Sequence, residues 1–356
     1  MRAESEQMEE RVAYLRGKVV LVTGAAGTIG SALVSAIARA GARSVRALDH
    51  GESELFYLFE KVRGLGNVAP MVGDVRDLER LRLAFSGVDV VFHAAALKHV
   101  ELGEYNPFEV VETNLRGLNN VIRAALDAEA ERVIFTSSDK AVNPTNVMGA
   151  SKMMGERLTT AANEIRGSRR TRFASVRFGN VLGSRGSVIP IFAEAAYRGQ
   201  ALGLTHREMT RYVMTIDDAA RLVIEGGSMM HGGEVFVTKM QAVRIIDLAR
   251  VIIDELARDP SSIAITQTQI RPGEKLYEEL LSMEEIDRAY ESDRMLVVFP
   301  GNGSSLLGPG GRPEDYPFPL KRVERPWHSG QDKLLTVDEL RRYLLDNEIL
   351  APWKRS

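Results

Sequence analysis

The sequence contains no cysteine among its 356 residues, which excludes disulfide bonds, thiolate nucleophiles and cysteine-based zinc sites. Its six histidines show no metal-ligand spacing, so we expect no bound metal. Lys and Arg (46) nearly balance Asp and Glu (48), and the formal net charge of −2 gives no basic field for DNA or RNA. No apolar run approaches the ~20 residues that span a bilayer, and the charged segment 1–18 does not resemble a signal peptide. We therefore expect a cytoplasmic protein with no membrane span and no nucleic-acid partner.

Short β-branched segments alternate with longer helical patterns through the first half of the chain. The predicted strands cover residues 18–23, 43–49, 88–93, 132–137 and 172–178. Such alternation is typical of a doubly wound parallel sheet. We therefore predict an α/β fold with a Rossmann-type sheet. Asn106 as cap and Pro107 start one predicted helix, and another begins near Asn146.

Three glycines, Gly24, Gly27 and Gly30, directly follow the first predicted strand and open a helix. Glycine lets the backbone approach a pyrophosphate, whose charge the helix N-terminus stabilises. A tight turn without a ligand would show the same pattern, but Asp49 ends the next strand, where a carboxylate binds the adenosine ribose and repels a 2′-phosphate. We therefore predict NAD rather than NADP. The candidate cofactor-binding residues are Gly24, Ala26, Gly27, Thr28, Ile29, Gly30, Asp49, Asp74, Val75, Ala94, Ala95, Ala96, Asn114 and Lys152.

The regular alternation ends after Phe178, where glycine and proline interrupt the chain more often. We expect a smaller α/β substrate-binding region in this part of the chain. The predicted division is an N-terminal extension at 1–17, an NAD-binding domain at 18–185 with 209–240, a substrate-binding region at 186–208 with 241–330, and a C-terminal helix and tail at 331–356. Residues 244–257 have helical periodicity, 301–319 are rich in Gly and Pro, and Thr336 with Glu339 forms a capping-box pattern.

Polar and ionisable residues gather at the end of the fifth predicted strand. Ser138, Asp139 and Lys140 follow this strand, and Lys152 lies on the next predicted helix. An exposed Asp–Lys pair would contribute little, and Lys152 could be a solvated helix charge. Ligands of open α/β sheets, however, bind at the carboxyl ends of the strands. We therefore predict the active site at this edge.

The pattern TGxxGxxG, the serine at the fifth strand end and the downstream lysine resemble the short-chain dehydrogenase/reductase superfamily. Longer strings, including HAAALKHVELGEYNPFEVVETN, SSDKAVNPTNVMGASK and RFGNVLGSRGSV, resemble its polysaccharide-biosynthesis branch of nucleotide-sugar dehydratases, which includes UDP-N-acetylglucosamine 4,6-dehydratases. The superfamily's usual tyrosine, four residues before the lysine, is replaced here by Met148. Some members of the branch keep the tyrosine, and others, including larger membrane-anchored relatives, carry methionine as this chain does.

This resemblance implies 4,6-dehydration of a UDP-N-acetylhexosamine, with UDP-N-acetylglucosamine as the expected substrate and a tightly bound, recycled NAD. NAD takes hydride from C4 of the sugar and returns it to C6, after a base removes the C5 proton and an acid protonates the departing C6 hydroxyl. Asp139 and Lys140 match this acid and base. Ser138 would hydrogen-bond the C4 oxygen, and Lys152 would bind the nicotinamide ribose. The candidate catalytic residues are Ser138, Asp139, Lys140, Met148 and Lys152.

Two steps of this chemistry depend on where protons are held. Lys140 must be neutral part of the time to act as a base, so we expect burial or the nearby Lys152 to lower its pKa. Met148 cannot accept the C4 hydroxyl proton, because a thioether is only a weak hydrogen-bond acceptor. Ionised Asp139 and a water relayed to Lys152 are the alternatives, and Met148 is expected to pack the pocket wall.

The resemblance also implies residues around the nucleotide diphosphate. Arg271 suits a diphosphate through its paired donors, although it could be a loop charge, and Glu274 can accept from a ribose hydroxyl. A lone His99 is given no chemical role. The candidate substrate-binding residues are Lys98, Asn180, Val188, Lys239, Arg271 and Glu274.

Two other functions stay open at this point. A nucleotide-sugar epimerase would use the same transient oxidation, but simple C4 epimerisation needs no acid at C6. A catalytically silent NAD-binding regulator would explain the missing tyrosine, but not the retained Asp139, Lys140 and Lys152. By resemblance we expect a homodimer or larger homo-oligomer that pairs through the helices at 107–127 and 146–166, where Met153 and Leu158 are core or interface residues.

Overall fold

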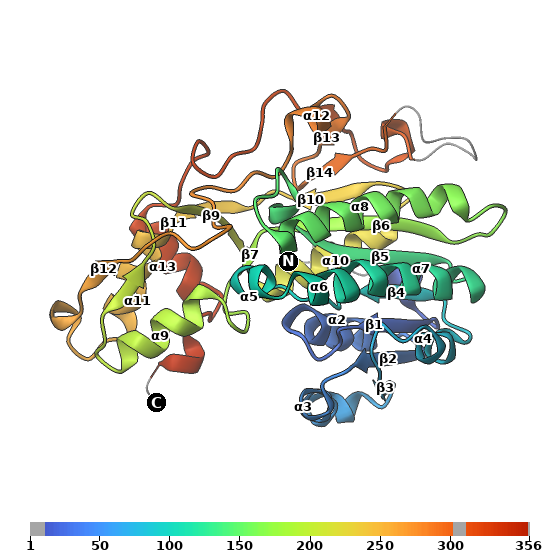
Figure 1. Ribbon diagram of the computed structural model, residues 1–356, viewed down its shortest axis with the longest axis horizontal. Coiled ribbons are helices and arrows are strands. Elements are labelled where there is room, and N and C mark those ends of the chain that lie inside the picture. The colour runs from blue at the N-terminus through green and yellow to red at the C-terminus, as the bar shows by residue number, and fades with distance from the viewer. Residues whose placement is uncertain (1–10, 302–310, 355–356) are drawn as a thin grey trace.

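The computed structural model describes residues 11–301 and 311–354 and has a ten-stranded sheet at its centre (Figure 1). Six strands of the first half and one later strand form parallel neighbours in the order β3-β2-β1-β4-β5-β6-β10. These strands are β1 (Val19–Thr23), β2 (Ser44–Asp49), β3 (Val68–Val72), β4 (Val90–His93), β5 (Arg132–Ser138), β6 (Arg172–Phe178) and β10 (Val235–Thr238). Three antiparallel strands, β14 (Met295–Val298), β13 (Ala289–Glu291) and β15 (Lys321–Arg322), extend one edge. The predicted Rossmann-type sheet is confirmed.

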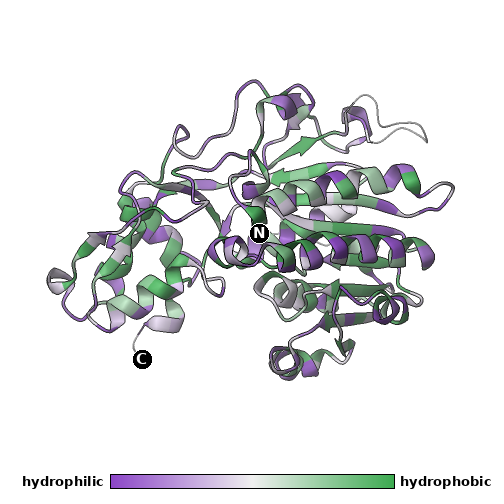
Figure 2. Cartoon of the chain, viewed as in Figure 1, coloured by the Kyte–Doolittle hydropathy of each residue, from purple (hydrophilic) through white to green (hydrophobic). Residues whose placement is uncertain are grey.

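Helices cover both faces of this sheet because its central strands are buried on both sides (Figures 1 and 2). One face carries α2 (Thr28–Arg39), α3 (Glu52–Val62) and α10 (Ile216–Met229). The other carries α4 (Leu78–Phe85), α7 (Gly117–Asp127) and α8 (Val147–Ile165). Asn146 caps α8 by accepting a hydrogen bond from the Gly149 amide at 2.7 Å, which fixes the start of the helix that carries Met148 and Lys152.

A smaller region beyond the carboxyl ends of the strands has a core of its own (Figure 1). It contains a three-stranded sheet of β7 (Asn180–Val181), β9 (Thr210–Met214) and β11 (Gln241–Arg244), and a pair of β8 (Leu202–Leu204) with β12 (Ile265–Gln267). Around them pack α9 (Val188–Tyr197), α11 (Ile245–Leu256) and α13 (Val337–Asp346). The capping box predicted at Thr336 and Glu339 is confirmed at the start of α13.

Some segments join other sheets than their predicted regions imply. Strand β9 belongs to the small sheet, although 209–240 was assigned to the NAD-binding domain. Strands β13 to β15 belong to the central sheet, although they lie in the predicted substrate-binding region. A short strand contains no sequence feature that identifies the strand it pairs with. Sequence alone therefore cannot assign such a strand to the central or the small sheet. Residues 1–10 of the predicted extension and 302–310 of the Gly- and Pro-rich stretch lie outside the described residues.

The predicted helix at 107–127 is interrupted. It consists of α6 (Pro107–Val110), a π-helical turn (Val111–Arg116) and α7, and the shorter α5 (Val100–Tyr105) precedes it. Pro107 does occupy the first turn, but Asn106 does not cap it, because its side-chain amide donates to the Leu102 carbonyl instead. No helix in the described part of the chain is both long and apolar enough to cross a membrane.

The remaining short helices connect these elements. They are η1 (Ala13–Leu15), η2 (Arg63–Leu65), η4 (Asp139–Ala141), η5 (Pro260–Ser262), α12 (Met283–Ile286), η6 (Pro313–Asp315) and η7 (Ala351–Trp353). Of these, η4 directly follows β5 and carries Asp139 and Lys140.

Candidate active site

A cleft of about 840 Å³ lies at the carboxyl ends of the parallel strands, between the central sheet and the smaller region. This is the edge at which open α/β sheets bind ligands, and the volume suits a ligand of nucleotide size. Most of the predicted site residues line it: Gly24, Gly27, Thr28, Ile29, Gly30, Ala94, Ala96, Lys98, Ser138, Lys140, Met148, Lys152, Asn180, Val188, Arg271 and Glu274. The structure therefore brings the cofactor, catalytic and substrate candidates together.

The glycine loop between β1 and α2 leaves no room for side chains. A Cβ on Gly24 would lie 2.5 Å from the Ala95 nitrogen, and one on Gly30 would lie 2.0 Å from the Gly24 carbonyl oxygen. Gly27, the N-cap of α2, offers no side chain to its first amides. A tight loop with helix amides that no side chain caps fits the pyrophosphate of a dinucleotide.

Two other cofactor candidates, Asp49 and Asn114, are not among the cleft-lining residues and hold loops beside the cleft. The Asp49 carboxylate accepts hydrogen bonds from the amides of Ala26 at 2.9 Å and Gly51 at 3.0 Å, which ties the end of β2 to the glycine loop. The Asn114 side chain, on the π-helical turn, bonds both the amide and the carbonyl of Leu97. These contacts fix the loops after β2 and β4 relative to the cleft.

The strand-end carboxylate Asp74 is bound to a neighbour and lies outside the cleft lining. Arg76 hydrogen-bonds it through its guanidinium and lowers the pKa of this carboxyl below its ordinary value. Val75 is buried and packs beside Gly117. Both predicted cofactor roles stay predictions.

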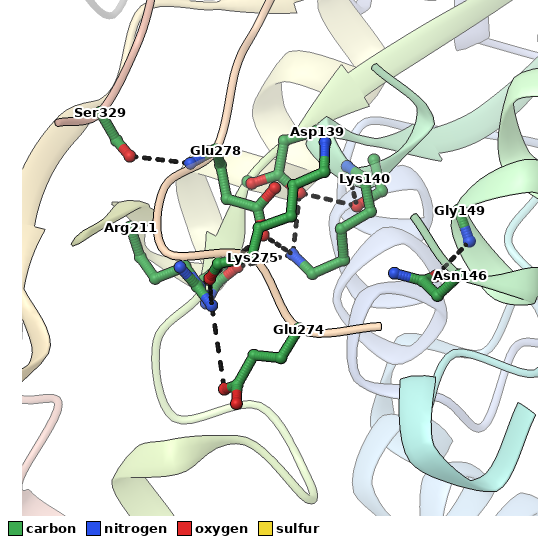
Figure 3. Close-up of polar contacts among 12 residues, drawn as sticks. Asp139, Lys140, Asn146, Gly149, Arg211, Glu274, Lys275, Glu278 and Ser329 are labelled. Atoms are coloured by element: carbon green, nitrogen blue, oxygen red, sulfur yellow. Dashed lines mark hydrogen bonds and ion pairs between the residues drawn. The ribbon is translucent and has the colours of Figure 1, made fainter. Parts of the chain in front are cut away.

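The predicted acid and base meet at the start of η4 (Figure 3). Asp139 is fully buried, and its Oδ1 accepts from Lys140 Nζ and from Ser138 Oγ, each at 2.9 Å. Lys140 Nζ also donates to Asn180 Oδ1 at 3.0 Å. The chain thus holds a carboxylate and an amine in direct contact, with the amine facing the cleft.

The expected decrease in the pKa of Lys140 is wrong. Desolvation lowers this pKa, but the negative charges of Asp139 and Glu278 outweigh it, so the pKa is raised above the ordinary lysine value. The sequence prediction considered burial and Lys152 but not the opposing charges of Asp139 and Glu278. Lys140 is therefore an ammonium ion at neutral pH in this arrangement.

Lys152 has the opposite shift. Its Nζ donates to the Thr136 carbonyl at 2.8 Å and lies 4.7 Å from the centre of the Phe135 ring. Desolvation lowers the pKa of Lys152 to about 8, and the nearest carboxylate, Glu156, offsets only part of this effect. Met148, one helical turn earlier, is buried in the cleft wall, where it offers only a thioether.

All of the substrate-binding candidates except Lys239 line the cleft. Lys98 Nζ donates to the Arg185 carbonyl at 2.7 Å, and burial together with Arg185 lowers the pKa of Lys98. Arg271 faces the cleft but is paired with Glu101 at 3.5 Å. Lys239 is not among the lining residues, because its ammonium pairs with Glu291 at 2.6 Å.

Two charged residues that the sequence analysis gave no role complete the cluster around Lys140 (Figure 3). Glu278 Oε1 lies 3.5 Å from Lys140 Nζ and 3.7 Å from Arg211 Nε. The Arg211 guanidinium binds the Lys275 carbonyl at 2.8 Å and so holds the loop that carries Glu278. A charged residue inside the buried strand β9 was the available signal for Arg211. Glu278 was given no role because its partners are distant in sequence.

The chain is similar to known proteins over most of its length. The family described as polysaccharide biosynthesis protein matches residues 20–300. A Methanocaldococcus jannaschii protein described as an uncharacterized membrane protein is 48% identical over 291 residues, which are 81% of this chain and 87% of the relative. An inverting UDP-N-acetylglucosamine 4,6-dehydratase from Campylobacter jejuni is 36% identical over 80% of this chain and 83% of the relative. A UDP-glucose 4-epimerase from Rickettsia conorii is 37% identical over 76% of this chain and 80% of the relative. Two other curated relatives are longer, and the chain matches 46% of their length.

Solved structures show the same fold. The crystal structure of Pen from Bacillus thuringiensis has a TM-score of 0.86 and 37% identity, over 95% of this chain and 99% of that chain. The dTDP-glucose 4,6-dehydratase DesIV from Streptomyces venezuelae, solved with NAD bound, has a TM-score of 0.65 and 25% identity, over 72% of this chain and 86% of that chain. The chain therefore belongs to the polysaccharide biosynthesis protein family, in the nucleotide-sugar dehydratase branch of the short-chain dehydrogenases/reductases.

Proposed function

We propose that the protein is a lyase that catalyses NAD-dependent 4,6-dehydration of a UDP-N-acetylhexosamine, with UDP-N-acetylglucosamine as the first substrate to test. The observation that carries this proposal is the contact of Asp139 with Lys140, in which a carboxylate and an amine are 2.9 Å apart at the sheet edge. Removing water across C5 and C6 needs a base that takes the C5 proton and an acid that protonates the departing C6 hydroxyl. One adjacent pair can supply both groups.

In this proposal each group near the pair has a defined task. Lys140 removes the C5 proton and later returns it, and Asp139 protonates the departing C6 hydroxyl. Ser138 hydrogen-bonds the C4 oxygen. Asn180, which accepts from Lys140 at 3.0 Å, keeps the amine aimed at the sugar.

The C4 hydroxyl proton needs an acceptor, because Met148 cannot take it. The pKa of about 8 at Lys152 supports a relay through water to this lysine, since a useful fraction is neutral near neutral pH. Ionised Asp139 is the other acceptor within the cleft, and it needs a proton for the later elimination. Both routes leave the proton inside the site.

The glycine loop supports a bound dinucleotide, which would supply reversible hydride transfer with the sugar. Asp49 at the end of β2 favours NAD, because a carboxylate there repels a 2′-phosphate. NAD in the related DesIV structure also supports this choice. We propose that NAD is tightly bound and recycled. On the substrate side, Lys98 and Arg271 carry the charges that suit a diphosphate.

A nucleotide-sugar 4-epimerase is the second candidate, and the relationship to the Rickettsia protein named UDP-glucose 4-epimerase favours it. Such an enzyme would use the same glycine loop and the same oxidation at C4. It would have no use for an acid at C6, so the buried Asp139 argues for dehydration.

We also propose a homodimer or larger homo-oligomer that forms through α5 to α8. The exposed face of these helices carries large apolar side chains, including Leu102, Tyr105, Phe108 and Met154. Leu158 of α8 packs instead against the core between the sheet and the helices. Pairing of this face with a second copy would remove apolar area from water.

Incubation of the purified protein with NAD and UDP-N-acetylglucosamine, followed by mass spectrometry and NMR, tests the proposal. A 4-keto-6-deoxy product that is lighter by one water supports dehydration. Formation of UDP-N-acetylgalactosamine, which has unchanged mass, would replace it with epimerisation. Unchanged sugar despite demonstrated binding of both ligands would favour the NAD-binding regulator.

A further inference from the structure

The proposed dehydration leaves a proton-balance problem at Lys140, and the following inference rests on that proposed function. The Lys140 ammonium is surrounded by three acceptors, Asp139 Oδ1, Asn180 Oδ1 and Glu278 Oε1, at 2.9, 3.0 and 3.5 Å. An ammonium ion cannot remove the C5 proton. It must first give one of its own protons to a neighbour.

On the route in which the C4 hydroxyl proton goes to Asp139 and not to Lys152, Asp139 does not solve this problem alone. If it takes the C4 hydroxyl proton, it becomes the acid that C6 requires, and it then has no room for a second proton. The amide of Asn180 is not basic. Among the described residues that contact Lys140 Nζ, this leaves the Glu278 carboxylate.

The geometry of Glu278 fits a group that takes up and releases a proton. It is 2% exposed, and its Oε2 is buried without a hydrogen-bond partner among the described residues. Its distances to Lys140 and Arg211, 3.5 and 3.7 Å, are longer than those of strong hydrogen bonds. Its backbone, by contrast, is fixed, because the amide donates to Ser329 Oγ and the carbonyl accepts from the Ser329 amide, both at 2.9 Å.

A structural ion-pair cluster in the same protein has a different arrangement. Arg177 binds Glu156 and Glu285 through hydrogen bonds of 2.6 to 3.0 Å. Burial raises the pKa of Glu285, but Arg177 outweighs it and the pKa falls to about 2. At Glu278 burial dominates over Lys140 and the pKa is raised. The two clusters therefore shift the pKa values of their carboxyl groups in opposite directions.

We propose that Glu278 accepts the surplus proton of Lys140 during turnover and returns it afterwards. The resting state is Asp139 carboxylate, Lys140 ammonium and Glu278 carboxylate. The C4 hydroxyl proton then reaches Asp139, and one N–H proton of Lys140 moves to Glu278. This leaves a neutral amine to take the C5 proton and a carboxylic acid to protonate the C6 hydroxyl, after which the Lys140 ammonium donates one of its protons to C5 and Glu278 returns its proton to Lys140.

Glu278 acts through Lys140 and does not contact the reacting carbons, so it is a positioning residue. The charged groups that face it are Asp139 and Lys140 from η4, Arg211 from β9 and Lys275 from its own loop. Substitution Glu278→Gln keeps the shape of the side chain and removes proton uptake. Glu279, the next residue, contacts Asn143 at 3.0 Å and lies outside the cluster, so Glu279→Gln is the matched control.

The first experiment needs no turnover. Glutamate labelled with ¹³C at the side-chain carboxyl is titrated by NMR in the full chain with NAD, and the Glu278 signal is assigned by its loss in Glu278→Gln. We expect it to titrate well above the ordinary glutamate pKa of about 4.3, in the wild type and in Glu279→Gln alike. If no glutamate carboxyl of the wild type titrates in that range, Glu278 is not a proton acceptor and the proposal is overturned.

The second experiment is the pH profile of UDP-N-acetylglucosamine dehydration. Glu278→Gln is expected to lower kcat at pH 7 on the order of 10²-fold with little change in KM, and to regain rate as pH rises and Lys140 loses its proton to solvent. Glu278→Asp should restore part of the rate. The proposal is contradicted if Glu278→Gln reaches half of its maximal kcat at a lower pH than the wild type does. Loss of a purely electrostatic partner would have that effect, because it lowers the pKa of Lys140. If the wild type does not dehydrate the sugar, the proposed function fails, and the NMR titration alone decides about Glu278.

Discussion

Lys140 and Lys152 both reach into the cleft, yet their pKa values move in opposite directions. Desolvation lowers the pKa of both side chains. Lys140 touches two carboxylates that reverse the effect, whereas Lys152 contacts a carbonyl and an aromatic ring and stays low. Neighbours rather than residue type decide which lysine is charged.

This difference predicts how stability depends on pH. The pKa of Lys152 is about 8 in the folded chain and about 10.4 when unfolded, so between these values the unfolded chain binds more protons and stability rises with pH. Below pH 8 Lys152 is charged in both the folded and the unfolded chain, so the full free-energy cost of burying its charge lowers the stability of the folded chain. Lys152→Met should therefore gain stability relative to the wild type at pH 7, and this gain should shrink by on the order of 3 kcal/mol by pH 10.4. Urea unfolding of both proteins at several pH values measures it, and a difference that does not change with pH would refute the assignment.

At the scale of residues, the sequence identified the polar groups that lie near the end of the same strand. Asp139 and Lys140 follow β5, and Lys152 lies on the following helix, so chain order and strand geometry indicated that they meet. Glu278 and Arg211 were missed because their contacts with η4 arise from folding of the second region over the sheet edge. Apart from the charged position inside β9, local patterns contain no information on such contacts. The pKa of Lys140 was mispredicted because the negative charges of the adjacent Asp139 and of the distant Glu278 were not weighed against desolvation.

At the scale of elements, the turn from β1 to α2 depends on glycine at one position in particular. A Cβ on Gly30 would lie 2.0 Å from the Gly24 carbonyl, which belongs to the backbone of the loop and cannot move aside cheaply. Gly30→Ala should therefore distort the loop, weaken NAD binding by more than about tenfold and lower Tm. Calorimetric titration with NAD and a thermal melt measure both effects.

Gly64, which has open space around its Cβ position, provides the control for this substitution. Gly64→Ala should leave NAD binding unchanged. Equal binding by Gly30→Ala and Gly64→Ala would mean that the loop does not hold the dinucleotide.

The elements themselves were largely predictable, because burial on both faces leaves a continuous apolar run for each central strand. The strands predicted at 18–23, 43–49, 88–93, 132–137 and 172–178 match β1, β2, β4, β5 and β6 within two residues at each end. The π-helical turn at Val111–Arg116 was not predicted, since the apolar spacing of 107–127 fits an uninterrupted helix. The side-chain contact of Asn114 with Leu97 accompanies this turn and is not visible in the sequence.

At the scale of the whole molecule, the exposed apolar face of α5 to α8 predicts self-association. Phe108 is 83% exposed, so a charge there should not disturb the fold of one chain. Phe108→Asp is therefore expected to shift the protein toward monomer without lowering Tm of the monomer, as measured by sedimentation velocity. Phe56→Asp on α3, another exposed aromatic position, should leave the oligomer intact. A wild type that sediments as a monomer would contradict the proposed pairing.

The cleft is formed by both parts of the molecule. The central sheet supplies the glycine loop and the Asp139–Lys140 pair, and the smaller region supplies Arg211 and Glu278. The sequence indicated a second region but could not show how it closes over the strand ends. The closure joins residues that are up to 139 positions apart in the cluster around Lys140, from Asp139 to Glu278.

The most direct test of the central claim is the fate of the C5 hydrogen in deuterated water. Wild-type protein with NAD and UDP-N-acetylglucosamine should yield a 4-keto-6-deoxy sugar that carries deuterium at C5, because Lys140 exchanges its protons with solvent before it returns one. Lys140→Ala should form no such product, while the exposed control Lys61→Ala should match the wild type in product and label. A dehydrated product formed by Lys140→Ala at the wild-type rate would contradict the account.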